Sequence, residues 1–238
     1  MPQYVSPQAK SYAKQAEDLV KQNQTNLAID YWRKAIAIAP KISSKVYKRL
    51  ADSLATEGLL EEAVEIMYLA IQNHPDHYLG YSALGNFLLE QGEIENAIAN
   101  YQQSLQLITN APSWIYRKLG NQLLKSFRLA EAETVCQEFV AKYPDDYKSH
   151  LSLARVAIAS DQWELALERL DVGITLFSDQ LDFVLKKITA LYKLDLSEHV
   201  KNTIQKAKYR FPNEVKLSLA EARLYQKQYD YQTAQTIL

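Results

Sequence analysis

The segment around Trp114 carries the side chains best suited to bind another molecule. Trp114, Arg117, Lys118 and Asn121 follow one another at helical spacing, so that neighbours lie within one turn of a helix. An arginine can hold a carboxylate through two hydrogen bonds, an asparagine can hold a peptide amide, and a tryptophan provides a large, rigid contact surface. This combination indicates recognition of an acidic peptide segment.

Residues that could catalyse a reaction or bind a metal are few and scattered. The sequence has none of the phosphate-loop, nucleophile-elbow or zinc-protease motifs. His74 and His77 form an H-x-x-H pair, but no third ligand is evident, so a polar turn is the better interpretation. Cys136 and His150 fall at positions that we expect to pack between helices. We therefore expect no enzyme activity in this chain, no cofactor and no metal site.

Composition restricts the class of protein. The chain has 238 residues, is 47% hydrophobic and has a formal net charge of -1, which disfavours a generic nucleic-acid binder. No basic, apolar leader opens the chain, and no stretch approaches the ~20 apolar residues of a membrane-spanning helix. The single cysteine fits a reducing compartment. We expect a soluble, cytoplasmic protein.

Small and apolar residues recur at a step of 34 or 35 residues. The repeated positions are Ala28, Ala63, Ala97, Ala132, Ala166, Val200 and Ala234, and prolines recur in the same register at Pro40, Pro75, Pro144 and Pro212. Within one period, apolar residues at a spacing of three and four predict a helix over 45–54 and a second helix from about residue 60. Gly58 separates the two, and Pro75 ends the second. The unit is a helical hairpin, and Asp76, Asp145 and Asn213 are predicted to cap the helices that follow.

This pattern resembles the tetratricopeptide repeat, a unit of 34 residues. The third copy reads Tyr81-x2-Leu84-Gly85-x2-Leu88, followed by Gly92, Ala97 and Tyr101, and the fourth reads Tyr116-x2-Leu119-Gly120-x2-Leu123. The later copies depart from the pattern, with His150 and Val184 at the aromatic position and Lys187 where leucine is usual. The resemblance implies an all-α, right-handed α-solenoid of about seven antiparallel helical hairpins.

The copies give the expected domain organisation. After an N-terminal lead-in at 1–8, the repeats are predicted at about 9–43, 44–77, 78–112, 113–146, 147–180, 181–214 and 215–238. The seventh copy is truncated and lacks the polar capping helix that usually closes a solenoid. This favours either a fragment of a longer protein or an open end that packs on another molecule, for example in a homodimer.

In the resembling family, positions 2, 5, 6, 9 and 13 of each repeat point into a concave groove. These thirty-five positions hold sixteen basic and only four acidic residues here, so the resemblance implies a basic groove. We expect Trp114, Arg117, Lys118 and Asn121 to form its centre. The remaining predicted partner-binding residues are Lys48, Arg49, Asn86, Lys148, Arg155 and Lys186. An alternative is that lysines only solvate the exposed side of the first helices.

Some family members hold the carboxy-terminal carboxylates of chaperones with a set of Lys, Asn and Arg side chains. Arg117 and Asn121 resemble the first part of that set, but Ser152 replaces the middle Asn and Asp182 stands where Lys is needed. This departure disfavours a chaperone-tail receptor.

The sequence thus predicts a non-catalytic protein–protein interaction scaffold that binds an acidic or anionic segment. A second hypothesis is the N-terminal repeat region of a larger bacterial enzyme, such as a glycosyltransferase, where it would position an acceptor or mediate dimerisation. Binding of RNA or another polyanion is the third, because related arrays of ~35 residues bind RNA.

Overall fold

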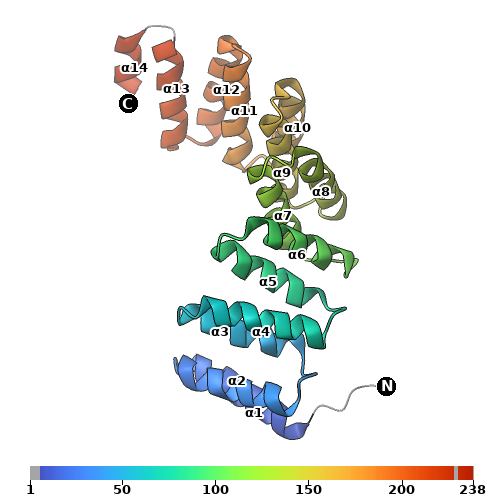
Figure 1. Cartoon of the computed structure of the whole chain (residues 1–238). Helices are drawn as coiled ribbons and strands as arrows, with labels where there is room; N and C mark the ends of the chain where they lie inside the picture. Colours follow the sequence, from blue (N-terminus) through green and yellow to red (C-terminus); the bar gives the residue numbers. More distant parts are fainter. Residues whose placement is uncertain (1–5, 228–229, 238) are drawn as a thin grey trace. The chain divides into compact units, whose positions relative to one another are not determined.

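The computed structural model describes residues 6–227 and 230–237, and these residues form helices and turns without a strand (Figure 1). The helices are α1 (Pro7–Lys21), α2 (Thr25–Ile38), α3 (Ser44–Thr56), α4 (Leu60–Asn73), α5 (Tyr78–Glu90), α6 (Ile94–Gln106), α7 (Ser113–Lys125), α8 (Leu129–Lys142), α9 (Tyr147–Ala159), α10 (Trp163–Leu176), α11 (Leu181–Lys193), α12 (Ser197–Arg210), α13 (Val215–Lys227) and α14 (Tyr231–Ile237). Most of the predicted lead-in, residues 1–5, lies outside the described residues, as does Leu238. The all-α fold expected from the repeat pattern is confirmed.

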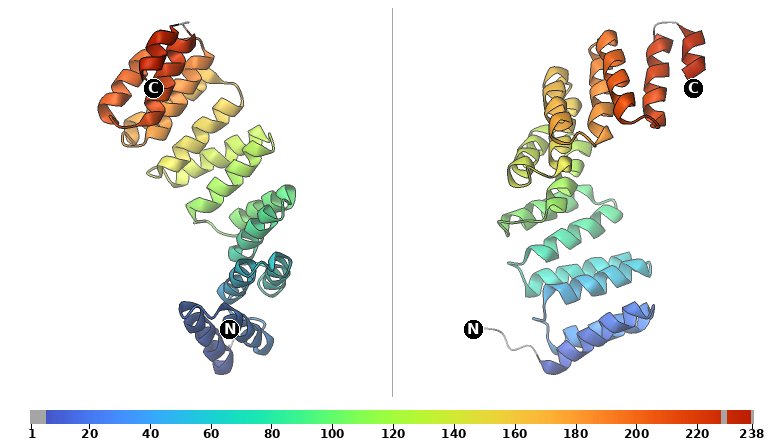
Figure 2. Two further views of the ribbon diagram at one scale, coloured as in Figure 1. Left: turned by 90° about the vertical axis from the view of Figure 1, so that its left-hand side faces the viewer. Right: turned by 180° about the vertical axis from the view of Figure 1, so that it is seen from behind.

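Consecutive helices pair as hairpins, for example α1 with α2, α3 with α4 and α9 with α10 (Figure 2). We call the odd-numbered helices, one for each hairpin, the first helices, and the even-numbered ones the second helices. The chain divides into two compact units, Met1–Leu119 and Gly120–Leu238, and the division falls within α7. Each unit is described by itself below.

The turn between the two helices of a hairpin contains a residue with left-handed backbone geometry. Gly58 and Gly92 have φ of 82° and 81°, and the equivalent residues are Asn23, Phe127, Asp161 and Asp195, with φ between 54° and 60°. Glycine, asparagine and aspartate tolerate this region, whereas an aromatic residue is strained in it. The turn geometry therefore repeats even where the sequence has no glycine.

The turns between hairpins correct the predicted caps. Pro75 and Asp76 occupy the two central positions of a turn closed by the His77 N–H to the His74 carbonyl at 3.1 Å. Proline favours the first central position of such a turn, and the residue after it must take the second. The helix therefore starts one residue later than predicted, and the N-caps of α5 and α9 are His77 and Asp146 rather than Asp76 and Asp145.

The third predicted cap is wrong for the same reason. Asn213 follows Pro212 inside a turn closed by the Glu214 N–H to the Phe211 carbonyl at 3.3 Å, and α13 begins at Val215. A Pro-Asp or Pro-Asn pair in these repeats thus forms the inter-hairpin turn and does not cap the next helix.

The cores of both units lie between the helices, where small residues allow close approach. Trp32, Tyr47 and Tyr101 are buried in the first unit, and Phe183 is buried in the second. A Cβ on Gly85 would lie 3.0 Å from the Tyr101 ring, and one on Gly173 would lie 2.2 Å from the Phe183 ring. Gly173 occupies the repeat position that Ala35 and Ala70 occupy in other hairpins, where small residues are buried, and the structure adds that the Phe183 ring lies against it.

Candidate functional site

Three of the six predicted binding residues of the first unit meet around a small hollow between first helices. This hollow of about 230 Å³ is lined from α3 by Lys48 and Asp52, from α5 by Asn86 and Glu90 among others, and by Lys118 of α7. Three of the predicted residues, Lys48, Asn86 and Lys118, are thus brought together. Asp52 and Glu90, two of the four acidic residues at the groove positions, line the same hollow.

The acidic residues change the electrostatics of this unit. Lys48 Nζ lies 2.6 Å from Asp52 Oδ2, and Arg49 Nε lies 3.3 Å from Glu17 Oε1. Two of the cations in the predicted basic groove are therefore neutralised by acids on the same face. Such exposed pairs contribute little to stability, but they reduce the positive potential that an acidic ligand would meet.

Asn86 is held in a fixed orientation for hydrogen bonding. The Tyr101 hydroxyl donates to Asn86 Oδ1 at 2.7 Å, so the carboxamide keeps its NH2 group for another acceptor. Burial, with the nearby Glu90 charge, raises the pKa of Tyr101, so the hydroxyl remains a donor at neutral pH. An amide fixed in this way can donate to a peptide carbonyl. Of the other predicted residues in this unit, Trp114 and Arg117 are half-buried on α7 and Lys118 is exposed.

In the second unit, Asn121, Arg155 and Lys186 form a contiguous group on α7, α9 and α11. Arg155 Nη1 donates to Asn121 Oδ1 at 2.6 Å. Burial lowers the pKa of Lys186, and the Arg155 charge lowers it further, whereas Asp182 acts in the opposite direction. Arg155 and Lys186 are thus like charges in a half-buried setting, and neither has a salt bridge to an acid in the described part of the chain. Lys148 lies at the start of α9, seven residues before Arg155, and its Nζ is 5.6 Å from the centre of the Tyr147 ring.

A larger hollow of about 530 Å³ lies between α11 and α13. Its apolar lining includes Leu185, Ile188 and Leu219, and its basic lining is Lys193, Lys216, Arg223 and Lys227. The sequence prediction named none of these as site residues, although the four cations were among the basic groove positions. Leu151, Leu185 and Leu219 recur every 34 residues at one of these positions, and this periodicity was the signal that could have identified the apolar contact.

Two of these cations have partners outside the hollow. Lys227 Nζ donates to Asp195, and Lys193 Nζ lies 5.7 Å from the centre of the Trp163 ring. Lys216 and Arg223 are exposed and make no salt bridge with the residues that the structure describes. The surface therefore combines apolar contact area with cations that an anionic ligand could engage.

The residues suited to chemistry have structural contacts. His74 Nε2 lies 2.6 Å from the Ile42 carbonyl oxygen, and His77 Nδ1 accepts from the Leu79 N–H at 3.2 Å. His150 Nε2 lies 2.9 Å from the Pro144 carbonyl oxygen, and its ring packs on Phe177. Burial raises the pKa of the Cys136 thiol to about 12, so it remains protonated and unreactive at neutral pH.

Across residues 6–227 and 230–237, no three His, Cys, Asp or Glu side chains come together in a way that could hold a metal ion. Within the same ranges, none of the helices combines the length and the apolar character needed to cross a membrane.

Solved structures with the same fold cover nearly the whole chain. A tetratricopeptide repeat protein from Parabacteroides merdae has a TM-score of 0.69 and 13% identity, covering 98% of this chain and 91% of its own. PilF of Pseudomonas aeruginosa has a TM-score of 0.64 and 18% identity over 90% of this chain and 97% of its own. YrrB, described as a tetratricopeptide repeat protein with an unusual peptide-binding site, has a TM-score of 0.65 and 16% identity over 80% and 97%. At these identities the likeness establishes the fold.

Sequence comparison points to the same repeats. DnaJ homolog subfamily C member 3 of Rattus norvegicus is 24% identical over 122 residues, which are 51% of this chain, and the chain spans about a quarter of that relative's length. Two family models, both described as tetratricopeptide repeat, match residues 13–78 and 80–110. Arrays of this repeat are scaffolds for protein–protein interaction. The chain therefore contains tetratricopeptide repeats over residues 13–78 and 80–110, and the helical hairpins of both units have the fold of such repeats.

Proposed function

We propose that this chain is a non-catalytic scaffold that binds an acidic segment of a partner protein along the first helices of its second unit. The observation that carries the proposal is the proximity of two like charges, those of Arg155 and Lys186. Both side chains are half-buried, and the Arg155 charge is near enough to lower the pKa of Lys186 by more than Asp182 raises it. A carboxylate placed between them would replace their repulsion by two charge-assisted hydrogen bonds.

The charge distribution favours the second unit over the first. From Asn121 onward, the groove positions hold eight basic residues and one acidic residue, Asp182. In the first unit they hold eight basic and three acidic residues, and Lys48 and Arg49 are already paired. An acidic ligand therefore displaces fewer existing ion pairs in the second unit.

The hollow between α11 and α13 indicates that the ligand is not purely ionic. Leu185 is half-buried and Leu219 is 40% exposed, and both line this hollow beside Lys216 and Arg223. Burying apolar area there contributes about 25 cal/mol per Å², a contribution that salt does not screen. We therefore infer a segment in which acidic residues alternate with large apolar ones.

The test is binding of labelled peptides to the intact chain, followed by fluorescence anisotropy. A peptide that alternates glutamate and leucine should bind. The double variant Arg155→Glu/Lys186→Glu should bind this peptide at least tenfold more weakly. Binding should also weaken between 50 and 300 mM salt, because exposed charges are screened over roughly 8 Å at physiological ionic strength.

Lys34→Glu/Lys41→Glu is the matched control, because it makes the same change in net charge on exposed lysines away from the first helices. It should leave the affinity within twofold of the unaltered chain. Equal losses in both variants would show that only net charge matters and would contradict the proposal. Tighter binding of random RNA than of the acidic peptide would replace it with a nucleic-acid function.

A further inference from the structure

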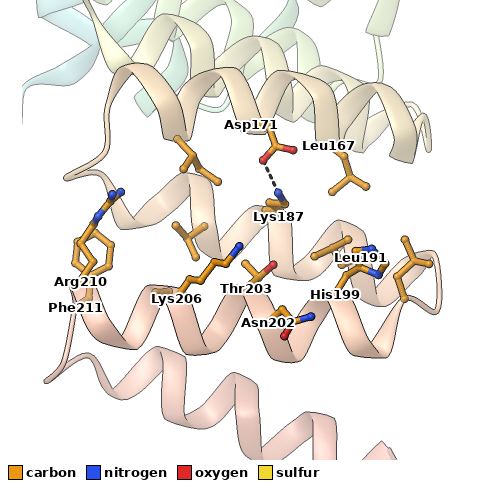
Figure 3. A pocket seen from close by; sticks show the side chains of 14 residues that line it. Leu167, Asp171, Lys187, Leu191, His199, Asn202, Thr203, Lys206, Arg210 and Phe211 are labelled. Atoms are coloured by element: carbon orange, nitrogen blue, oxygen red, sulfur yellow. Dashed lines mark hydrogen bonds and ion pairs between the residues drawn. The ribbon is translucent and has the colours of Figure 1, made fainter.

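A third hollow, larger than the two on the first helices, lies on the side of the second helices, between α10 and α12 with α11 beneath (Figure 3). Its volume is about 620 Å³. Three residues from each of α10 and α11 line it, and α12 contributes a stripe from His199 to Arg210 that extends over about three helical turns. None of these residues belongs to the groove positions.

The hollow coincides with a departure of the sequence from the repeat pattern. Lys187 occupies the position at which Leu50, Leu84 and Leu119 are fully buried in other repeats. The Lys187 ammonium is directed to the Asp171 carboxylate of α10, with which it forms an ion pair (Figure 3). A residue that packs between helices elsewhere therefore forms part of the lining of an open site here.

The basic residues of this hollow lie toward one end. Lys206 and Arg210 lie there with the Phe211 ring beside Arg210, and Leu167 and Leu191 lie at the other end with His199 (Figure 3). Arg210 Nη1 donates to the Ser178 carbonyl at 2.9 Å, which leaves its other donors for a ligand. Lys206 is exposed and has no salt bridge within the part of the chain that the structure describes. Since Asp171 is already paired with Lys187, the unmatched charge of the hollow is positive.

We propose that this hollow is a second docking site for a polypeptide segment that carries bulky apolar side chains at one end and carboxylates at the other. The apolar side chains contact Leu167 and Leu191, and the carboxylates bind Lys206 and Arg210. The site is separate from the acidic-segment site on the first helices, so one chain can hold two segments at once.

Exposure favours a polypeptide as the occupant. The volume of about 620 Å³ is within the ~300–1,000 Å³ of small-molecule pockets, so the exposed side of the hollow is what distinguishes the two. His199, Asn202, Lys206 and Arg210 along α12 are all exposed, so one side of the occupant stays in water. A peptide with an apolar and a polar face meets this condition, because only its apolar face needs burial.

The experiment is selection of peptides from a random dodecapeptide phage library on the intact chain, with anisotropy measurements on the enriched sequences. Two variants probe the hollow: Thr203→Trp fills its centre, and Lys206→Glu reverses a charge at its basic end. Each variant should weaken the binding of enriched peptides that carry apolar residues at one end and acidic residues at the other (apolar-acidic peptides) by at least tenfold. Because Lys206 is exposed, Lys206→Glu decides the result even if Thr203→Trp fails to fold.

Two controls separate this site from the rest of the molecule. Lys201→Glu makes the same charge change on α12 outside the hollow, and Arg155→Glu/Lys186→Glu disables the proposed first-helix site. Both should retain binding within twofold. The proposal is overturned if no apolar-acidic peptide is enriched, or if enriched peptides bind Lys206→Glu as tightly as the unaltered chain. Dodecanoate, a small ligand with one apolar chain and one carboxylate, is the alternative occupant. Binding of dodecanoate in the hollow without binding of the peptides would also overturn the proposal.

Discussion

At the scale of single residues, side chains with reactive groups serve mainly to join one repeat to the next. The Tyr47 hydroxyl donates to the Pro40 carbonyl at 2.5 Å, and His150 contacts the carbonyl of Pro144 in the equivalent place. A hydrogen bond of this kind contributes about 0.5–1.5 kcal/mol, so either ring stabilises the junction. His150 thus replaces the usual aromatic residue without loss of the contact.

Gly173→Ala should destabilise the chain by about 2 kcal/mol. The added Cβ would lie 2.2 Å from Cε1 of Phe183, whose ring is fully buried and cannot move without disturbing the core. Overpacking of this kind costs about 1–3 kcal/mol and outweighs the ~1 kcal/mol that alanine gains in a helix. Urea unfolding measures the change. Val172→Ala, at a half-exposed neighbour on the same helix, is the control and should change stability by less than about 0.5 kcal/mol.

His77 should make the chain less stable as the pH falls below its ordinary pKa of 6.5. Partial burial and the nearby His74 charge lower the pKa of His77 in the folded chain, so the unfolded chain takes up its proton first. The free energy of unfolding therefore decreases from pH 6.5 downward until the folded-state pKa is passed. His77→Asn keeps a capping side chain but cannot titrate, and the urea midpoints of the two proteins at pH 7.5 and 5.5 give the comparison. An equal pH dependence in both would exclude His77 as its source.

At the scale of elements, the turn within each hairpin is fixed by backbone geometry more than by residue type. The left-handed residue recurs at each turn from Asn23 to Asp195, but only Gly58 and Gly92 are glycines. The helices on both sides impose the turn because their packing determines where the chain must reverse. The least suitable residue at this position is Phe127, whose side chain is 82% exposed.

Phe127→Gly should stabilise the second unit by roughly 0.5–1 kcal/mol. A left-handed conformation costs a residue other than glycine about 1–2 kcal/mol, and the larger unfolded-state entropy of glycine offsets part of that gain. No buried contact is lost, because the ring is exposed. Thermal melting measures the effect. Gly58→Ala is the converse change, in a turn where an added Cβ meets nothing within 4 Å, and it should destabilise by a similar amount.

At the scale of the whole molecule, a net charge of -1 conceals two different surfaces on the first helices. In the first unit, Arg49 and Lys48 are paired with Glu17 and Asp52. In the second, Arg155 and Lys186 are like-charged neighbours. The total charge therefore says little about which part of the chain attracts an anionic partner.

Neutralising cations should lower stability in the first unit but not in the second. Lys48→Gln/Arg49→Gln breaks two exposed ion pairs and should lower the free energy of unfolding by about 1 kcal/mol. Lys186→Gln removes a repulsion between like charges and should leave the free energy of unfolding unchanged or raise it. The same change should weaken the binding of acidic peptides. Urea unfolding and anisotropy measure the two effects. A loss of stability from Lys186→Gln comparable with that of the double variant would contradict the proposed repulsion.

The helices and their pairing could be predicted from the sequence because they depend on local patterns. Apolar spacing of three and four residues specifies each helix, and small residues at a constant step, such as Ala63 and Ala97, specify where two helices touch. The caps at Asp76 and Asp145 were wrong by one residue, since a Pro-Asp pair can either form a turn or precede a helix, and only the closed turn distinguishes the two.

The sequence by itself determined an all-α repeat array with an excess of basic residues on its first helices. Only the tertiary structure decided which of these cations are already paired, because Glu17 and Arg49 lie 32 residues apart in the chain yet meet between neighbouring helices. It also showed that Lys187 pairs with Asp171 and lines an open hollow on the opposite side of the hairpins. Repeat periodicity predicts the face of the helix on which a side chain lies. Ion pairs and hollows depend on the distances between helices, which cannot be read from the sequence pattern.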